Sequence, residues 1–455
     1  MPGNLTLDQL RDLAADGRID TVVVAIVDMQ GRLMGKRFHV QNFLETAHEE
    51  THCCNYLLAT DMEMATPDGY AATSWQAGYG DHAMKPDLST LRLAAWTEGA
   101  ALVLCDVEDH HSHEPIPHAP RSMLRKMVAR LGELGYRCNA ATELEFFLYR
   151  ESYEEARDKQ YRDLEPISPY NEDYHLFQTA TEEPVMRRLR NTLHAAGVPV
   201  ESTKGEAERG QEELNIRYTD ALDMADNHSI AKHAVKEVAW QAGRSATFLS
   251  KTHEGSVGSS SHIHQSLIDV DGEPAFFDAD AEHGMSVIMQ HYLAGLLKYT
   301  RDCTFFLAPY INSYKRFAKG TFAPTRVVWS IDNRTAGYRI VAPDSPGVRV
   351  ECRIGGADMN PYLAMAAQLA AGIRGIEEGL SMAEEFRGDA YVNDEAEQLP
   401  SSLREAAQAL RESSMLRDAF GDAVVDHYVR CAEWEQEEFD RIVTDYEVRR
   451  GFERV

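Results

Sequence analysis

The chain has 455 residues, of which 44% are hydrophobic and 26% are charged, a balance typical of soluble globular proteins. Its formal net charge of −27 argues against nucleic acid and anionic membranes as partners. The longest clean apolar stretch, residues 21–27, is too short to cross a bilayer, and the N-terminus lacks a secretory pattern, so we expect a cytoplasmic protein. Seven cysteines without CxxC spacing predict reduced thiols.

The N-terminal portion is rich in predicted strands. Residues 21–27 and 28–38 predict a hairpin, because residues 28–31 (DMQG) supply turn chemistry between two apolar segments. Residues 91–96 and 101–107 are further strand candidates. We therefore expect a small strand-rich domain before residue 113.

Residues 109–122 hold three prolines and four histidines and show no periodicity. This composition predicts a linker with solvated histidines. The histidines could also bind a metal, but their spacing fits no standard site.

Longer helical patterns dominate the rest of the chain. We expect a loop at 153–171 and two or three charged helices within 400–448. The other predicted helices share apolar residues at helical spacing, and they cover residues 123–134, 184–196, 229–242 and 361–380, the last of them buried. Long helices separated by strands, after a strand-rich start, indicate an α+β fold.

Two glutamates lie two positions apart in the apolar stretch ATELEFFLYR, residues 141–150. On a strand, Glu143 and Glu145 would share one face, and Leu144 and Phe146 the other. Like charges on a buried face are unfavourable unless something neutralises them. The strand therefore predicts a cationic partner.

Two later stretches carry possible metal ligands. Residues 200–216 contain Glu201, Glu206 and Glu213 around a predicted turn at 210–211, and alone they favour a solvated acidic loop. Residues 255–267 place His262 and His264 on one strand face after a Gly/Ser-rich loop. A single H-x-H pattern is weak, since core histidines are common.

Two further stretches concentrate arginines among apolar residues. Semi-buried guanidinium groups need anionic partners, which are protein carboxylates in one interpretation and substrate oxygens in another. The arginines with their alternating glutamate are Arg316, Arg334, Arg339, Arg349, Glu351 and Arg353. An internal salt-bridge network would explain each stretch separately.

Taken together, the four stretches supply oxygen ligands and imidazoles for divalent metals, and arginines suited to phosphoryl oxygens. That combination favours phosphoryl transfer. The sequence has neither a Walker A motif nor a kinase-type glycine loop.

At this point the chain resembles the glutamine synthetase superfamily nearly from end to end. The ordered motifs that carry the resemblance are E-x-E-F-F at 143–147, E-x-x-x-G-Q-x-E at 206–213, H-x-H-x-S-L at 262–267, N-S-Y-K-R at 312–316, N-R at 333–334, R-x-E-x-R at 349–353 and N-P-Y-L at 360–363.

The resemblance implies a β-grasp N-terminal domain over residues 1–112. A catalytic domain over residues 113–455 would follow, with a curved antiparallel sheet and flanking helices. It also implies a homo-oligomer, usually a dodecamer of two hexameric rings, in which a neighbour's N-terminal domain completes each active site.

The resemblance also implies roles for individual residues, with ATP as co-substrate and two or three Mg²⁺ or Mn²⁺ ions per site. One ion would be held by Glu145, Glu206 and Glu213, and the second by Glu143, His262 and Glu351. Nucleotide contacts would come from Glu201, His264 and Ser266, and contacts to the ATP phosphates from Arg339 and Arg349. The glutamate substrate would be bound by Arg316, Arg353 and Gly258, and the transferred phosphoryl group by Arg334.

The flap after N-S-Y-K-R departs from the ammonia-using pattern G-x-E-A-P. Here the stretch is G-T-F-A-P, so Phe322 occupies the position of the glutamate that binds and deprotonates ammonium. A phenyl ring accepts no proton, but it offers an apolar wall and a π face.

Two more departures concern the amine side and the amino-acid side. The usual ammonium-site aspartate is not recognisable within residues 58–80, although Asp81 matches a second family aspartate. We expect Asp81 of a neighbouring subunit to receive the amine's proton. Val257 replaces the usual asparagine before Gly258.

These departures predict a γ-glutamyl-amine ligase that forms γ-glutamyl phosphate and then couples it to an organic amine, with a short monoamine such as ethanolamine or methylamine favoured. The alternatives are a γ-glutamylpolyamine synthetase, an ammonia-using glutamine synthetase and a catalytically silent scaffold or regulatory homologue.

Overall fold

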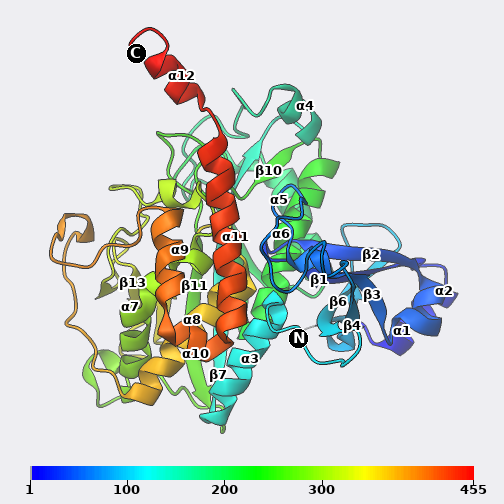
Figure 1. Ribbon diagram of the computed structural model, residues 1–455, viewed down its shortest axis with the longest axis horizontal. Helices are drawn as coiled ribbons and strands as arrows, with labels where there is room; N and C mark the ends of the chain where they lie inside the picture. Colours follow the sequence, from blue (N-terminus) through cyan, green and yellow to red (C-terminus); the bar gives the residue numbers. More distant parts are fainter. Residues whose placement is uncertain (1–2) are drawn as a thin grey trace.

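The computed structural model describes residues 3–455, and its strands form two separate sheets (Figure 1). The N-terminal sheet has six strands in the order β2-β1-β6-β4-β3, with β5 paired to β6. Helices α1 (Leu7–Ala15) and α2 (Val40–Asn42) lie beside it. Its strands are β1 (Thr21–Val27), β2 (Leu33–His39), β3 (Thr51–Cys54), β4 (Asp81–Pro86), β5 (Arg92–Leu93) and β6 (Ala100–Asp109).

The predicted N-terminal hairpin is confirmed. Strands β1 and β2 pair antiparallel from Thr21↔His39 to Val27↔Leu33, while β1 also pairs parallel with β6. The strand expected over 91–96 shrinks to the two residues of β5. The chain leaves the sheet there because it turns after Ala94, whose carbonyl accepts a hydrogen bond from the Thr97 N–H at 2.8 Å.

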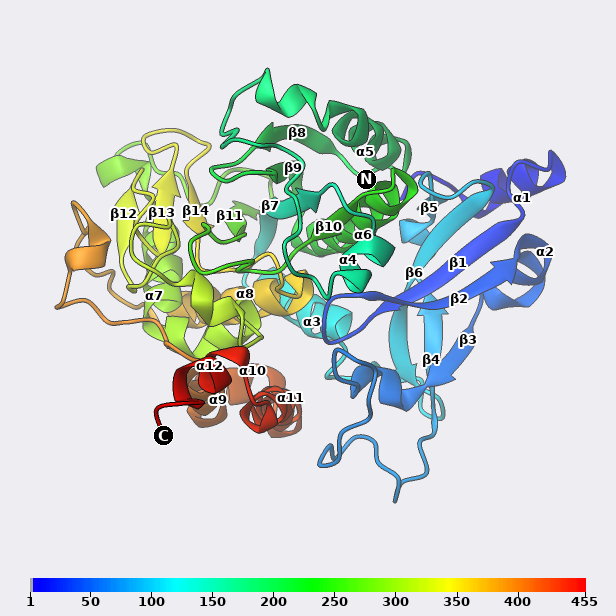
Figure 2. The same ribbon diagram turned by 90° about the horizontal axis from the view of Figure 1, so that it is seen from above.

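The second sheet has eight strands in the order β12-β13-β14-β11-β7-β9-β8, with β10 paired to β7. All of its named pairs are antiparallel except β12–β13. Figure 2 shows these strands following a curve from β12 to β8. The strands are β7 (Tyr136–Tyr149), β8 (Val200–Gly205), β9 (Gln211–Asp220), β10 (Ser245–Thr247), β11 (Ser261–Asp269), β12 (Trp329–Ile331), β13 (Tyr338–Val341) and β14 (Arg349–Cys352).

Helices cover this sheet, and they confirm the mixed α+β class. The central helix α8 is almost entirely buried, as its alanine-rich sequence predicts. A separate group of C-terminal helices packs outside it (Figures 1 and 2). The helices are α3 (Pro120–Glu133), α4 (Tyr153–Asp158), α5 (Glu183–Ala195), α6 (Ala221–Gln241), α7 (Val287–Leu307), α8 (Pro361–Glu378), α9 (Leu403–Glu412), α10 (Ser414–Phe420), α11 (Asp422–Arg441) and α12 (Asp445–Gly451).

Two further secondary-structure predictions are wrong in part. The loop expected over 153–171 begins with helix α4, which a capping box between Ser152 and Glu155 starts. The C-terminal region contains four helices rather than two or three. Ser413 caps a separate α10, and Gly421, with φ of 93°, ends it before α11 begins.

Polar contacts connect the N-terminal sheet to the helical core. The side-chain amide of Asn360, at the start of α8, donates to the carbonyls of Asp28 (2.9 Å) and Met29 (3.2 Å) in the hairpin turn. The buried Arg92 donates to Asn227 of α6 at 3.0 Å. These contacts fix the hairpin turn and β5 of the N-terminal sheet against the body that carries the second sheet.

The prediction of solvated linker histidines is wrong for His118. Its imidazole is buried and stacks on His427 of α11, with ring centroids 4.2 Å apart. Ile116 and Ala119, on either side of His118, are also buried, so this part of the segment packs against the protein core. His110, His111 and His113 are exposed as expected.

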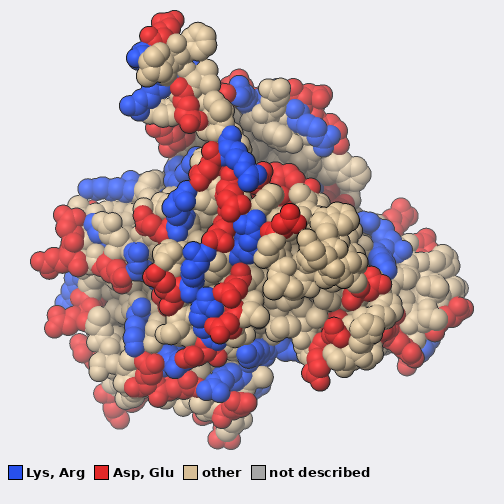
Figure 3. All heavy atoms as spheres, in the orientation of Figure 1, with Lys and Arg blue, Asp and Glu red and all other residues tan. Residues whose placement is uncertain are grey.

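Charges of both signs are interspersed over α9 and α11 on the face shown in Figure 3. Ion pairs such as Arg404–Asp440 (2.6 Å) and Arg417–Asp426 (2.8 Å) lie there. The seven cysteines are all free thiols. None of the helices within residues 3–455 combines the length and apolar character needed to span a bilayer.

Candidate active site

Strand β7 presents Glu143 and Glu145 on one face because side chains alternate along a strand. Leu144 and Phe146 are fully buried on the opposite face. The neighbouring strands add their own polar side chains at the same level, since β11 aligns His262 with Glu143 and β9 aligns Glu213 with Glu145. The sheet therefore collects acidic and imidazole groups from three adjacent strands.

A first carboxylate group consists of Glu145, Glu206 and Glu213, with one oxygen of each within 4.8 Å of the others. Burial, followed by the charge of Glu206, raises the pKa of Glu145 to about 7. Burial, followed by the charge of Glu143, raises the pKa of Glu213 to about 9. Lys204 contacts Glu206 and lies 3.8 Å from Glu213. The group is thus short of positive charge.

Glu145 is held in place by the loop before β11. Ser260 donates its N–H (2.7 Å) and its hydroxyl (2.5 Å) to the two carboxylate oxygens. The Gln211 amide donates to Glu145 at 3.2 Å. These bonds fix the direction in which the carboxylate points.

A second group surrounds Glu143. His264 Nε2 lies 2.9 Å and His262 Nδ1 3.0 Å from its oxygens. Although burial alone would raise the pKa of Glu143, these two imidazoles lower it. The atoms that lie within 4.8 Å of one another belong to Glu143, His264 and Glu351, while His262 is 3.5 Å from Glu351. Both imidazoles therefore reach the second group.

The arginines converge on the same region. Glu351 is fully buried between Arg353 (2.6 Å) and Arg339 (3.0 Å). Arg316 is buried and donates to the carbonyl of Gly355 at 2.8 Å, and burial lowers its pKa to about 10. Arg334 is exposed and forms no ion pair within residues 3–455.

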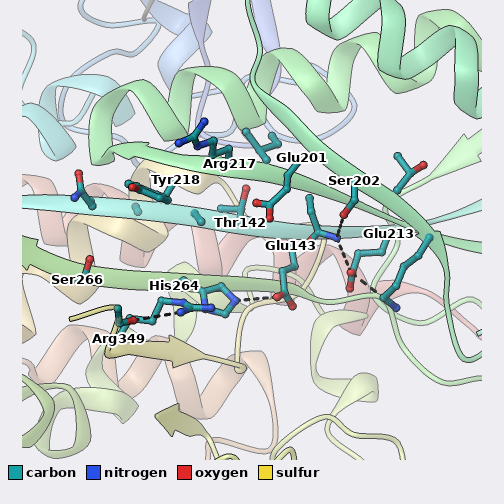
Figure 4. Close-up of a pocket in the computed structure, with 18 of the residues that line it drawn as sticks. Thr142, Glu143, Glu201, Ser202, Glu213, Arg217, Tyr218, His264, Ser266 and Arg349 are labelled. Atoms are coloured by element: carbon teal, nitrogen blue, oxygen red, sulfur yellow. Dashed lines mark hydrogen bonds and ion pairs between the residues drawn. The ribbon is translucent and has the colours of Figure 1, made fainter. Parts of the chain in front are cut away.

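These side chains line two cavities that meet. A larger one, of about 1630 Å³, contains Glu201, His264, Ser266 and Arg349 (Figure 4). Figure 4 shows His264 between Glu143 and Arg349, whose Nε lies 3.3 Å from His264 Nδ1. A smaller one, of about 290 Å³, is lined by Gly258, Arg316, Phe322, Arg334, Arg339 and Arg353. Glu143 and Glu213 line both cavities.

Phe322 lies at the rim of the smaller cavity. Its φ of 57° is in the left-handed region, and its side chain is 55% exposed. Asp173, Tyr174 and Lys204 also line this cavity, although the sequence analysis did not select them. Lys204 carries a detectable signal, because it precedes Glu206 by two residues at the end of a strand, whereas the loop position of Asp173 and Tyr174 carries none.

Two predicted site residues line neither cavity. Glu351 is fully buried and forms ion pairs with Arg339 and Arg353. Asp81 is exposed at the start of β4 in the N-terminal sheet. Since Asp81 was expected to act in a neighbouring subunit, its role stays a prediction.

The family model described as the glutamine synthetase catalytic domain matches residues 117–451. The chain belongs to the glutamine synthetase family. The match spans both carboxylate groups, the flap and the arginines of the two cavities. This confirms the resemblance inferred from the ordered motifs.

Several relatives in the glutamine synthetase family align over nearly the whole chain. A γ-glutamylethanolamide synthetase of Streptomyces coelicolor is 47% identical over 452 residues, which is 99% of this chain and 96% of the relative. A glutamate–isopropylamine ligase of a Pseudomonas species is 37% identical over 97% of both chains. The solved structure of a GmaS/ADP complex has a TM-score of 0.85 and 26% identity, covering 97% of this chain and 99% of that one.

Proposed function

We propose that the protein is an ATP-dependent ligase that joins the side-chain carboxylate of glutamate to an organic amine and releases ADP and phosphate. The observation that carries the proposal is Phe322. An aromatic ring lines the smaller cavity at the flap position where ammonia-using family members carry a glutamate. Relatives named for ethanolamine and isopropylamine support the same interpretation.

The two carboxylate groups fit hard divalent cations such as Mg²⁺ or Mn²⁺. Both groups offer buried or half-buried oxygens within 4.8 Å of one another, and the second adds imidazole nitrogen. Bound there, the ions would neutralise the phosphate charges of ATP. Glu145, Glu206 and Glu213 are the proposed ligands of one ion. Those of the other are Glu143, His262 and Glu351, with His264 also in reach.

The larger cavity is the proposed ATP site. Glu201, His264 and Ser266 would contact the nucleotide, and Arg349 and Arg339 its phosphates. Arg334 reaches the smaller cavity without an ion pair of its own, so its guanidinium is available to the phosphoryl group in transfer.

The smaller cavity is the proposed glutamate site. Arg316 and Arg353 would bind the charged groups of glutamate, and Gly258 leaves room beside Arg316. Phosphorylation of the side-chain carboxylate gives an acyl phosphate, whose phosphate is a better leaving group than oxide. The neutral amine attacks the acyl carbon, forms the C–N bond and expels phosphate.

The attacking amine must first lose a proton. An alkyl ammonium with a pKa of about 10.4 is almost entirely protonated at neutral pH. Phe322 cannot accept that proton, and we propose that Asp81 of a neighbouring subunit does. The ring instead gives the alkyl group an apolar wall, which favours a short monoamine.

The other candidate functions lack comparable support. The acidic residues Asp61 and Glu63 would favour a polyamine if they lay in the site, but both lie outside the two cavities, and Asp61 accepts from the Trp434 indole N–H at 3.0 Å. An ammonia-using enzyme should keep the flap carboxylate. A silent homologue should lose ligands of the carboxylate groups or the arginines, and all of them are present.

We also propose a division into domains at residues 112/113 and assembly into a dodecamer of two hexameric rings. One hydrophobic core cluster is drawn only from residues 10–119, which supports the division, although alternate residues of β1 and β6 belong to the larger cluster that contains the second sheet. We propose that the enzyme acts in the cytoplasm, where ATP and glutamate are supplied.

The test supplies purified protein with ATP, Mg²⁺ and glutamate and offers ammonia, methylamine, ethanolamine, isopropylamine and putrescine separately. Phosphate release and the amide product are followed. We expect the highest kcat/KM for a monoamine. Ammonia as the best substrate would overturn the amine-ligase proposal, and no phosphate release with any amine would support a silent homologue.

A further inference from the structure

A third carboxylate group lies outside the proposed catalytic site. Glu172, Glu182 and Glu212 each place an oxygen within 4.8 Å of the other two. The three side chains come from different segments, namely the loop after α4, the residue before α5 and strand β9. Glu212 follows the alternation of β9 onto the opposite face from Glu213.

The three residues are completely enclosed, with exposed fractions of 0%, 0% and 1%. Both oxygens of Glu172, both oxygens of Glu182 and one oxygen of Glu212 have no hydrogen-bond partner among residues 3–455. No arginine, lysine or histidine in the described chain forms an ion pair with any of them. Buried carboxylates without partners are among the most unfavourable arrangements in a protein interior.

The surrounding backbone is built closely around this group. A Cβ added at Gly205 would lie 2.6 Å from the Glu172 carbonyl oxygen and 2.7 Å from Glu172 Cγ, so only glycine fits there. The Asn171 amide donates to the Ala207 carbonyl at 2.8 Å, and the Tyr174 N–H to the Gly205 carbonyl at 3.3 Å. The loop that carries Glu172 is thus bonded to the turn between β8 and β9.

We propose that Glu172, Glu182 and Glu212 bind a structural divalent cation, separate from the ions of the catalytic site. Oxygen-only ligation suits a hard cation, and oxygens up to 4.8 Å apart fit around an ion with bonds of about 2.4 Å. Such an ion supplies the positive charge that the described residues do not. It fastens the loop that carries Asp173 and Tyr174 to strand β9, which carries Glu213.

Manganese is a suitable probe, because it accepts oxygen ligands and scatters anomalously. Crystals of the unmodified chain grown with Mn²⁺ as the only divalent cation should show an anomalous peak between the three carboxylates. No peak there, with peaks at the Glu145 and Glu143 groups, overturns the inference and leaves the proposed function intact. A peak there, in a protein that shows no activity with any amine, supports the inference and contradicts the proposed function.

The number of metal ions bound per chain in variants gives a second test that does not depend on activity. After removal of metal and equilibration with Mn²⁺, the double variant Glu172→Gln/Glu182→Gln should hold one ion per chain fewer than the unmodified protein. The variant Glu145→Gln/Glu351→Gln should retain that ion. An unchanged count in the first variant means that the carboxylates share protons instead, which overturns the inference.

A matched control uses another acidic group. Glu50, Glu108 and His113 also place their ligand atoms within 4.8 Å of one another, but these side chains are partly or fully exposed. Glu50→Gln/Glu108→Gln should leave the count unchanged. Loss of an ion in this control, with none lost in Glu172→Gln/Glu182→Gln, would assign the extra ion to the surface group and overturn the inference.

Discussion

The side chain at position 322 distinguishes the proposed amine ligase from an ammonia-using enzyme. A glutamate there would restore a group that pairs with ammonium and takes its proton. We expect Phe322→Glu to raise kcat/KM for ammonia at least ~10-fold relative to ethanolamine, since one proton-transfer group contributes about 10²–10⁴-fold. The ratio of the two kcat/KM values is the measurement.

The matched control is Phe322→Gln, which has the size of glutamate but no charge. The native φ of 57° is equally unusual for both new residues, so backbone strain does not separate them. Equal ammonia use by the two variants would show that removal of the ring, rather than the carboxylate, changes the preference.

Gly258 leaves space that Arg316 occupies. An added Cβ would lie 2.3 Å from Arg316 Cγ, 2.7 Å from its Cδ and 2.7 Å from the Ser250 carbonyl oxygen. Because the middle of the side chain cannot step aside, Gly258→Ala should displace the guanidinium. We expect KM for glutamate to rise about 10-fold or more, with ATP affinity unchanged, since Gly258 lines only the smaller cavity.

Gly255 in the same loop provides the control for this prediction. The nearest atom to an added Cβ is His253 Nδ1 at 3.8 Å, an ordinary contact. Gly255→Ala should keep normal KM values for glutamate and ATP. Equal effects of both substitutions would mean that the loop, and not Arg316, responds.

At the scale of elements, alternation along β7 and β11 made the side chains on one face of the second sheet predictable, because a strand fixes the direction of every second side chain. The stretch 200–216 alone suggested a solvated acidic loop, yet it forms the paired strands β8 and β9, in which Glu213 is buried and Glu201 is exposed. Only tertiary packing decides such a case. The contributions of Asp173 and Tyr174 to the cavity depend on a long loop whose path no local pattern specifies.

The stacked pair His118–His427 connects the segment before α3 to helix α11. Burial lowers the pKa of His427 to about 4, and burial together with His427 lowers that of His118 to about 2. Their neighbours are Tyr70, whose ring centroid is 4.6 Å from that of His427, and His82, 6.5 Å from His118. Neither imidazole forms an ion pair with a carboxylate within residues 3–455.

Stability should therefore fall as pH decreases. Below a pH of about 6.5, the ordinary pKa of histidine, both imidazoles are protonated in the unfolded chain. In the native protein they stay neutral until the pH falls to their lower pKa values, so the unfolded state binds more protons. Between pH 7.5 and 5.5 we expect the unfolding free energy to drop by about 1 kcal/mol more in the native protein than in His427→Gln. Urea unfolding at both pH values measures this difference, and parallel losses would contradict it.

At the scale of the whole molecule, helix α12 projects away from the body (Figure 1). The segment exposes apolar side chains that touch little of the chain, and its ion pair Asp445–Arg162, at 2.8 Å, is one of few contacts back to it. The exposed apolar residues are Ile442, Val443, Tyr446, Val448 and Phe452. Such a strip is typical of a contact between subunits.

If the protein forms the proposed dodecamer, removal of residues 442–455 should reduce it to smaller species, as measured by light scattering after size exclusion. The double substitution Val443→Ser/Phe452→Ser is the milder variant and should weaken assembly at low protein concentration. An unchanged mass for the truncated protein would show that α12 is not needed for assembly.

Because Glu143 and Glu213 belong to the walls of both cavities, we expect the binding of the proposed nucleotide and amino-acid ligands to be coupled. The charge of one bound ligand changes the electrostatic potential at these two carboxylates and therefore the affinity for the other ligand. Saturation with either ligand should change the Kd of the other by one common factor, as reciprocity of linked equilibria requires. A factor that tightens binding would make ATP bind better once its acceptor is in place.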